Sequence, residues 1–303
     1  MSSPPLVSAL TTTPGSSDYA AFRRALRRAA PALRRDLPWI NDPRPWAVLV
    51  SEVMLQQTQT SRVVEPWRRF LELFPTPSRC AEAPLSSVLT AWTGLGYPRR
   101  AKALHAAARV IRDEFDGVVP NDAVLLRQLP GVGEYTAHAV ASFAFGSPVA
   151  VLDTNVGRVL ARALENRTLK QSEARTLAAS LIPVSNAAGF NQAMLDLGAQ
   201  FCRAVPRCDV CPLRAQCAWQ RQGGNDPAPQ SAAVSRTQSA FVGSNRQLRG
   251  QVLRALTEKP RTVRQLARVV SDVAPSRRRE VLDSLVRDGL ITRHGETYCL
   301  AAG

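Results

Sequence analysis

Apolar residues recur at three- and four-residue spacing through most of residues 18–220, which places them on one face of a helix. Proline and glycine interrupt this spacing at intervals, and the alternating pattern of half-buried strands is scarce. The pattern predicts a mainly α-helical core. Residues 1–17, which include Thr11-Thr12-Thr13-Pro14-Gly15, show no such periodicity and are expected to form a disordered tail.

Composition changes after the core. Residues 221–245 are rich in Gly, Asn, Pro, Ser and Gln, which is typical of a linker. Three helices and a β-hairpin are expected beyond the linker, at residues 246–256, 263–270, 276–290 and 291–300. This order is typical of a winged-helix module, which we predict for residues 246–303.

Basic residues exceed acidic ones by 39 to 24, for a formal net charge of +15. Such a charge favours a polyanionic partner such as nucleic acid. Arg277, Arg278 and Arg279 on the last predicted helix suit DNA phosphates, although a docking domain with a solvated basic helix fits equally well. No apolar run approaches the roughly 18–20 residues that span a bilayer. We therefore expect a cytoplasmic protein with no membrane partner.

The segment Leu129-Pro130-Gly131-Val132-Gly133 precedes a helix-compatible run. Its two glycines predict a tight turn, because glycine alone adopts positive φ without steric cost. Backbone N–H groups at a helix N-terminus bind anions such as DNA phosphate. A loop rich in Gly and Pro then delivers Asp153. An ordinary helix corner with a capping Asp fits the same residues.

Two carboxylates have different expected surroundings. Glu52 has Val48, Leu49 and Leu55 on its side of a predicted helix, so its pKa is expected to rise, as a general acid requires. Asp153 precedes a helix whose amides favour its ionised form. Breaking a glycosidic bond through an oxocarbenium-like state uses one protonated and one ionised acid. A solvated surface Glu and a simple helix cap are the alternatives.

Four cysteines form a C-x5-C-x2-C-x5-C pattern: Cys202, Cys208, Cys211 and Cys217. This density in a cytoplasmic chain favours metal over disulfides. The thiolates suit either a [4Fe–4S] cluster or a structural zinc ion, and the spacing does not decide between them. Cys80 and Cys299 stand alone and are expected to be small apolar residues.

Three segments, Ser51–Thr60, Trp92–Tyr97 and Phe190–Ala199, resemble the adenine DNA glycosylases of the MutY type, in the helix-hairpin-helix Gly/Pro–Asp superfamily. With the turn and the cysteines, the resemblance covers about residues 30–220. It implies a two-lobed helical fold with a [4Fe–4S] cluster, although the first cysteine gap has five residues where the family has six. It further implies a monofunctional N-glycosylase that removes adenine mispaired with 8-oxoguanine or guanine in double-stranded DNA. We expect a monomer.

The resemblance also implies roles for single residues. Glu52 would protonate adenine at N7 and later handle the water, and Asp153 would stabilise the sugar cation. Asn155 would orient Asp153 and the sugar, and Tyr135 would line the same pocket. The expected DNA contacts are the wedge and opposite-base residues and the turn backbone: Gln57, Thr58, Leu95, Tyr97, Gly131, Val132 and Gly133.

Three other functions fit part of the same pattern. Glycosylase–lyases of the endonuclease III type have a Schiff-base lysine where this chain has Tyr135. Mismatch thymine glycosylases share a Glu and a Tyr at corresponding places, but Gln56-Gln57 and the Trp92–Tyr97 run favour adenine. A non-catalytic DNA-binding regulator with a redox cluster is opposed by the two acids. The last third of the chain lacks the Phe-Ser-His element and the length of the Nudix-like domain that many family members have. The sequence therefore does not identify which residues recognise the damaged guanine.

Overall fold

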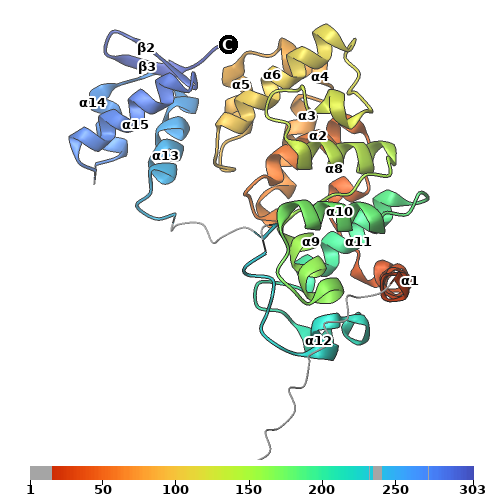
Figure 1. The fold of residues 1–303 in the computed structure, drawn as a ribbon. Helices are drawn as coiled ribbons and strands as arrows, with labels where there is room; N and C mark the ends of the chain where they lie inside the picture. Colours follow the sequence, from red (N-terminus) through yellow and green to blue (C-terminus); the bar gives the residue numbers. More distant parts are fainter. Residues whose placement is uncertain (1–15, 232, 235–240, 272) are drawn as a thin grey trace, which may run out of the picture. The chain divides into compact units, whose positions relative to one another are not determined.

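The computed structural model describes residues 16–231, 233–234, 241–271 and 273–303. Helices dominate this part of the chain, so the predicted mainly α-helical fold is confirmed (Figure 1). The chain forms two compact units. Of the described residues, the first unit comprises 16–35, 146–231 and 233–234, and the second comprises 36–145, 241–271 and 273–303.

The first unit is all helical. Its helices are α1 (Ser16–Leu33), α9 (Thr154–Val159) with its π-helical continuation (Leu160–Glu165), α10 (Gln171–Leu181), α11 (Ala187–Gln200) and α12 (Ala218–Gln222). Helix α11 packs against both α1 and α9 (Figure 1). The end of the π-helical segment is tied to α1, because the Tyr19 hydroxyl donates a hydrogen bond to Glu165.

The second unit begins with the other part of the helical core. Its helices are α2 (Pro45–Leu55), α3 (Val64–Leu73), α4 (Pro77–Glu82), α5 (Leu85–Ala91), α6 (Arg99–Glu114), α7 (Ala123–Leu126) and α8 (Glu134–Phe145). Short 3-10 turns occur at Pro38–Ile40 and Thr60–Arg62. Helix α2 packs against α8, and α4 packs against α6. No described helix is long and apolar enough to cross a membrane.

A C-terminal module belongs to the second unit. Its elements are α13 (Asn245–Glu258), β1 (Arg261–Thr262), α14 (Val263–Val269), α15 (Pro275–Arg287), β2 (Ile291–His294) and β3 (Thr297–Leu300). The three helices and the hairpin agree with the sequence prediction, and the hairpin turns at Gly295, whose φ is +61°. A third strand was not predicted: β1 pairs with β3, so the antiparallel sheet has the order β1-β3-β2.

Two predicted boundaries differ from the structure. Helix α1 begins at Ser16, inside the predicted tail, whose residues 1–15 lie outside the described part. The predicted linker 221–245 is partly packed, because Ala228 and Ser231 are 0% and 3% exposed. The Ser231 hydroxyl accepts a hydrogen bond from the Leu169 amide, which anchors this segment on the first unit. Linker residues 232 and 235–240 lie outside the described part.

Candidate active site

The predicted glycine turn lies before α8. Val132 donates its amide hydrogen to the Leu129 carbonyl at 3.1 Å, which closes the turn. Gly131 has a φ of +78°, and a Cβ there would lie 2.6 Å from the Cβ of Ala103 on α6. Both the backbone conformation and the lack of space therefore require glycine at this position. Gly133 does not have a positive φ, unlike the expectation for both glycines. Gly131 and Gly133 are exposed and Val132 is buried, so the glycine backbone is the part of this turn that a phosphate could contact.

Glu52 is buried in a helix that is apolar all round. Every residue of α2 from Trp46 to Met54 is buried, and Glu52 itself is 5% exposed. A helix of this kind lies inside the protein, so the alternative of a solvated Glu at the edge of an amphipathic helix is wrong. The carboxyl group instead lies where a charge is poorly solvated.

Asp153 is the N-cap of α9, and both of its carboxylate oxygens are held. Oδ1 accepts a hydrogen bond from the Val156 amide at 2.8 Å. Oδ2 accepts one from the Asn155 side-chain amide at 2.6 Å. Asn155 therefore orients Asp153, as the resemblance implied. Asp153 caps α9 and has its carboxylate held in one orientation at the same time. Its role as a helix cap therefore does not exclude a role as a fixed catalytic carboxylate.

The pKa of Asp153 moves in the direction opposite to the sequence expectation. Burial raises the pKa of this carboxyl, whereas the hydrogen bonds from Val156 and Asn155 and the charge of Arg158 lower it. The net shift is upward, because loss of hydration outweighs the amides of the helix N-terminus. The sequence showed those amides but could not show the burial.

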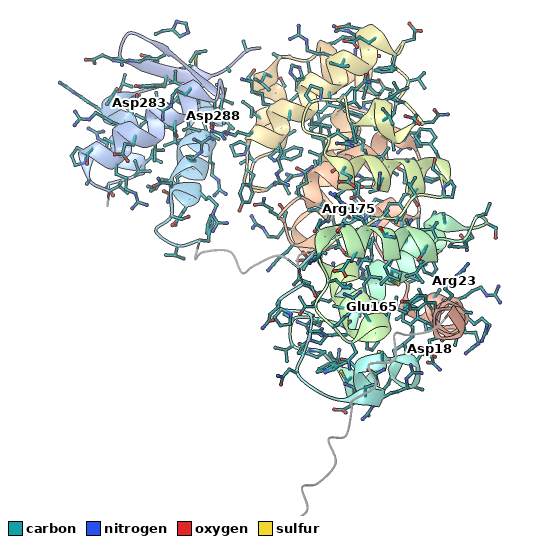
Figure 2. All side chains as sticks on the ribbon, viewed as in Figure 1. Asp18, Arg23, Glu165, Arg175, Asp283 and Asp288 are labelled. Atoms are coloured by element: carbon teal, nitrogen blue, oxygen red, sulfur yellow. The ribbon has the colours of Figure 1, made fainter. Side chains whose placement is uncertain are left out.

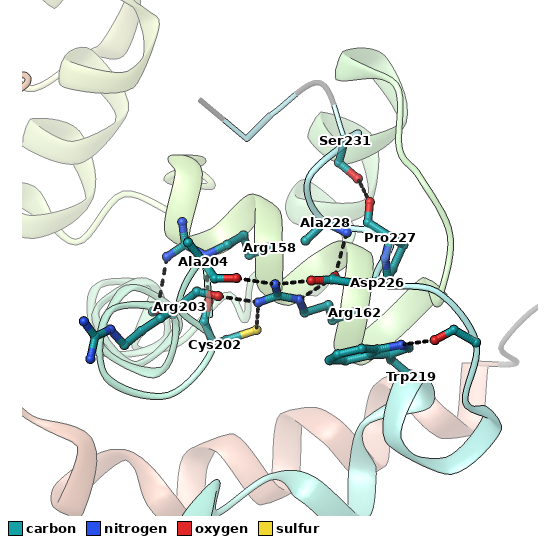
Figure 3. A network of polar contacts seen from close by, with 12 residues as sticks. Arg158, Arg162, Cys202, Arg203, Ala204, Trp219, Asp226, Pro227, Ala228 and Ser231 are labelled. Carbon is teal, nitrogen blue, oxygen red and sulfur yellow. Dashed lines mark hydrogen bonds and ion pairs between the residues drawn. The ribbon is translucent and has the colours of Figure 1, made fainter. Parts of the chain in front are cut away.

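Arg158 is a site residue that the sequence did not reveal. It is 8% exposed and lies one turn beyond Asn155 on α9. Its guanidinium donates to the Cys202 carbonyl at 2.7 Å, and both residues are labelled in Figure 3. It also donates to Asn155 Oδ1 at 2.6 Å and to the Gly198 carbonyl at 3.1 Å. One buried cation thus connects the Asp153–Asn155 pair to the start of the cysteine loop.

Gly198 brings α11 against α9 at the same place. A Cβ at Gly198 would lie 2.6 Å from the Asn155 carbonyl oxygen and 2.7 Å from its Cβ. Real Cβ atoms do not come so close to backbone, so this residue has to be glycine while Asn155 keeps its position. The motif Phe190–Ala199 therefore contributes to the site through the close approach of its backbone at Gly198.

The four predicted cysteine ligands come together in the first unit. They line one small cavity of about 30 Å³: Cys202, Cys208, Cys211 and Cys217. Burial raises the pKa of all four thiols. Among the described residues, however, no group of three or more His, Cys, Asp or Glu side chains is arranged closely enough to bind a metal ion.

Arg162 holds the cysteine loop from inside. It is 1% exposed, and its guanidinium lies 3.5 Å from Cys202 Sγ and donates to the Arg203 carbonyl at 2.6 Å (Figure 3). It also pairs with the Asp226 carboxylate at 2.6 Å, and its charge lies 5.6 Å from the centre of the Trp219 ring. The loop after Cys202 and the packed part of the predicted linker therefore share one buried cation.

The predicted DNA contacts differ in exposure. Gln57 is exposed with a φ of +55°, and Tyr97 is half-buried with a φ of +47°. Thr58 and Tyr135 are also half-buried, whereas Leu95 is 2% exposed and packs in the core. The core position of Leu95 leaves its side chain no surface for DNA in this structure.

Arg100 joins the two loops that carry the predicted wedge residues. Its guanidinium donates to the Val53 and Met54 carbonyls at the end of α2, at 2.8 and 2.9 Å. It also donates to the Thr58 hydroxyl at 2.9 Å and to the Gly96 carbonyl at 3.2 Å. Burial lowers the pKa of Arg100 to about 10, so it still carries its charge at neutral pH.

Comparison with known proteins shows the family to which the chain belongs. Residues 50–183 match the model of the HhH-GPD superfamily base excision DNA repair proteins. The chain is 45% identical over 281 residues to the adenine DNA glycosylase of Mycolicibacterium smegmatis, covering 89% of this chain and 92% of the relative. The chain belongs to the adenine DNA glycosylase family. It is therefore a DNA glycosylase, an enzyme that hydrolyses N-glycosidic bonds.

Other relatives of this glycosylase extend the comparison. The human adenine DNA glycosylase is 40% identical over 216 residues, which cover 66% of this chain and 40% of the human protein. A thermostable thymine-DNA glycosylase has a similar structure, with a TM-score of 0.62 and 27% identity over 68% of this chain and 97% of that one. A trapped endonuclease III–DNA covalent intermediate follows, with a TM-score of 0.58, 27% identity and coverages of 67% and 97%.

Proposed function

We propose that this glycosylase, acting as a monomer, removes adenine mispaired with 8-oxoguanine or guanine from double-stranded DNA. The observation that carries the proposal is the 45% identity to an adenine DNA glycosylase along most of both chains. The buried Glu52 and the anchored Asp153 support it, because glycoside hydrolysis needs two acids in different surroundings.

The proposed chemistry assigns one step to each acid. Glu52 donates its proton to N7 of adenine while the bond between N9 and the sugar breaks, and the bonding electron pair leaves with the base. The sugar carries the positive charge, which the Asp153 carboxylate stabilises. Water then adds to the sugar carbon and gives its proton to the Glu52 carboxylate. Asn155 keeps Asp153 in place, and Tyr135 lines the pocket.

The DNA contacts of the proposal come from the second unit. The Gly131 and Gly133 N–H groups are offered to a phosphate, and the Val132 amide closes the turn that presents them. Exposed Gln57 and half-buried Tyr97 supply an amide and an aromatic ring to the opened base stack, where such groups offset unstacking.

Excision from defined duplexes tests the proposal. Single-turnover reactions use duplexes that carry one A:8-oxoguanine, A:G, A:C, T:G or A:T pair. We expect rapid release of adenine opposite 8-oxoguanine and guanine and no thymine release. Thymine release from T:G with no adenine release would replace the proposal with thymine excision, the activity named for the structural neighbour.

As the pH is lowered, the rate of excision is expected to fall. The fall should begin at a higher pH than the pKa of an ordinary aspartate, which is about 3.9. Asp153 acts as a carboxylate and burial raises its pKa, so it becomes neutral at a higher pH than usual. Asn155→Ala removes a hydrogen bond that lowers this pKa, and it should move the acid limb higher still. The check is the pH dependence of single-turnover rates, with circular dichroism to exclude unfolding. If the rate falls at the same pH in the parent and in Asn155→Ala, Asn155 does not lower the pKa of the catalytic Asp153.

Strand breaks are expected only after alkali or heat. Tyr135 stands where a glycosylase–lyase has its lysine, so water rather than an amine attacks the sugar. Lys102 lies elsewhere in the second unit, where its Nζ donates to the Asp288 carbonyl at 2.8 Å. Gel analysis with and without alkali checks this expectation. Borohydride trapping of an enzyme–DNA adduct at the rate of excision would show a Schiff base instead.

We further propose that the four cysteines hold a [4Fe–4S] cluster. They line one cavity and are all thiols, and the charge of Arg162 beside Cys202 Sγ would offset thiolate charge. When bound, the cluster would cross-link the loop and stabilise its fold. Arg158 and Arg162 meanwhile hold the loop backbone.

Iron is expected at roughly four atoms per chain in protein purified without oxygen, with a broad visible absorption band. Cys202→Ser should lose most of the iron, because it removes a cluster ligand. Cys299→Ser, on β3 outside the loop, is the matched control and should keep it. Stoichiometric zinc without iron would establish the alternative metal.

A further inference from the structure

The C-terminal module is joined to helix α6 of the helical core through one carboxylate. Asp288, labelled in Figure 2, is the C-cap of α15, and its side chain is 7% exposed. Its carboxylate accepts hydrogen bonds from Arg99 of the core and Arg249 of α13. The Asp288 carbonyl also accepts from Lys102 of α6 at 2.8 Å. An ion pair with several donors on one buried carboxylate fixes geometry better than an isolated surface pair.

The module also contacts the loop that carries Tyr97. Arg246, in the first turn of α13, donates a hydrogen bond to the Tyr97 hydroxyl at 2.7 Å. Its guanidinium lies 5.7 Å from the centre of the Tyr97 ring. Arg100 of the core lies 5.3 Å from the same ring centre. Two guanidinium groups, one from the core and one from the module, therefore hold one tyrosine.

Tyr97 has a backbone conformation that needs such support. Its φ of +47° is left-handed, which an aromatic residue adopts only when its surroundings impose it. The loop before it contains Gly94 and Gly96, both at positive φ, so the loop itself provides little stiffness. The hydrogen bond from Arg246 fixes the direction in which the ring points.

Two of the three arginines on the basic helix of the module are held by neutral groups of the module itself. Arg277 donates to the Asn245 side chain at 2.9 Å, and Arg278 donates to the Ala267 carbonyl at 3.2 Å. Both are half-buried, and only Arg279 of this triplet is exposed. The triplet keeps its charges, and its binding to DNA phosphates stays a prediction. The Arg246 contact is the more specific link to the predicted DNA contacts, because it reaches Tyr97.

We propose that Arg246 is a positioning residue through which the C-terminal module fixes Tyr97 for contact with the base opposite the excised adenine. The inference rests on the proposed function, since it gives Tyr97 a DNA-facing role. The module thereby contributes to discrimination between 8-oxoguanine and guanine without touching the base itself.

Point variants of the full chain test this role. Arg246→Met keeps the length of the side chain but removes its charge and its donors, and Arg246→Lys keeps a charged donor. Arg254→Met removes one exposed arginine from the same helix and is the matched control. We expect Arg246→Met to lower the ratio of excision rates opposite 8-oxoguanine and guanine at least about fivefold. Arg246→Lys should restore part of the ratio, and Arg254→Met should stay within twofold of the parent.

A double-mutant cycle separates positioning from general DNA affinity. Tyr97→Phe removes the hydroxyl that accepts the Arg246 hydrogen bond. If Arg246 acts through Tyr97, Arg246→Met should change the ratio less than twofold in the Tyr97→Phe background. The proposal is overturned if Arg246→Met changes the ratio equally in both backgrounds. It is also overturned if Arg246→Met weakens binding to every duplex equally and makes the salt dependence of binding shallower, because that result indicates a phosphate contact.

A second readout does not depend on excision. A 2-aminopurine placed beside the base opposite the mispaired adenine brightens when an inserted ring unstacks it. The parent and Arg254→Met should brighten it on binding, and Arg246→Met should do so less at saturating protein. If the parent releases adenine and brightens the probe but Arg246→Met matches it in both assays, this inference alone is wrong. If the parent releases no adenine, the proposed function is wrong and the probe still decides the role of Arg246.

Discussion

Asp153→Asn is expected to lower the single-turnover rate of base excision by about 10²–10³-fold while duplex affinity stays within a few-fold of the parent. The amide keeps the size of the side chain and one oxygen for the Val156 amide, but it lacks the charge that stabilises the sugar cation. Asp122→Asn is the matched control, because Asp122 caps α7 in the same way. It should leave excision unchanged.

Glu52→Gln belongs to the same experiment and should slow excision by about 10²–10⁴-fold, since the amide has no proton to donate to the leaving base. Binding of the mispaired duplex should persist, because Glu52 is buried and is not a surface charge. Excision within a few-fold of the parent for either variant would remove that acid from the mechanism. Unfolding curves that match the parent are needed before either rate is interpreted.

Gly198→Ala is expected to reduce both stability and excision. The new Cβ would lie 2.6–2.8 Å from backbone and Cβ atoms of Asn155, so α9 or α11 has to move. Overpacking of this kind destabilises a protein by about 1–3 kcal/mol. Because Asn155 holds Asp153, the excision rate should fall at least tenfold, which is about 1.4 kcal/mol in the barrier. Denaturant unfolding and single-turnover kinetics measure the two effects.

Gly250→Ala is the matched control for this substitution. Gly250 lies in α13, and a Cβ there would have no atom within 4 Å. At a helical position with free space, replacing Gly by Ala raises the free energy of unfolding by about 0.5–1 kcal/mol. The Gly250→Ala variant should therefore be at least as stable as the parent. An equally stable and active Gly198→Ala protein would mean that the contact between α9 and α11 relaxes without moving Asn155.

The sequence by itself determined the features that depend on local order. Helical periodicity predicted the core and the three module helices, and the glycine turn before α8 follows from Gly131. The apolar residues around Glu52 predicted apolar surroundings for its carboxyl group. The structure confirms this, because the residues of α2 from Trp46 to Met54 are all buried. These patterns are visible in a sequence because neighbours along the chain create them.

Only the tertiary structure decided the features that depend on distant residues. Arg158 and Arg162 resemble ordinary helix arginines until Cys202 and Asp226, 40 to 64 positions away, approach them. The pKa of Asp153 rises because packing removes its water, although its local amides predict the opposite. The burial of Leu95 and the hydrogen bond of Arg246 to Tyr97 have the same origin. Burial and long-range hydrogen bonds depend on which segments meet in space, and helical periodicity carries no information about that.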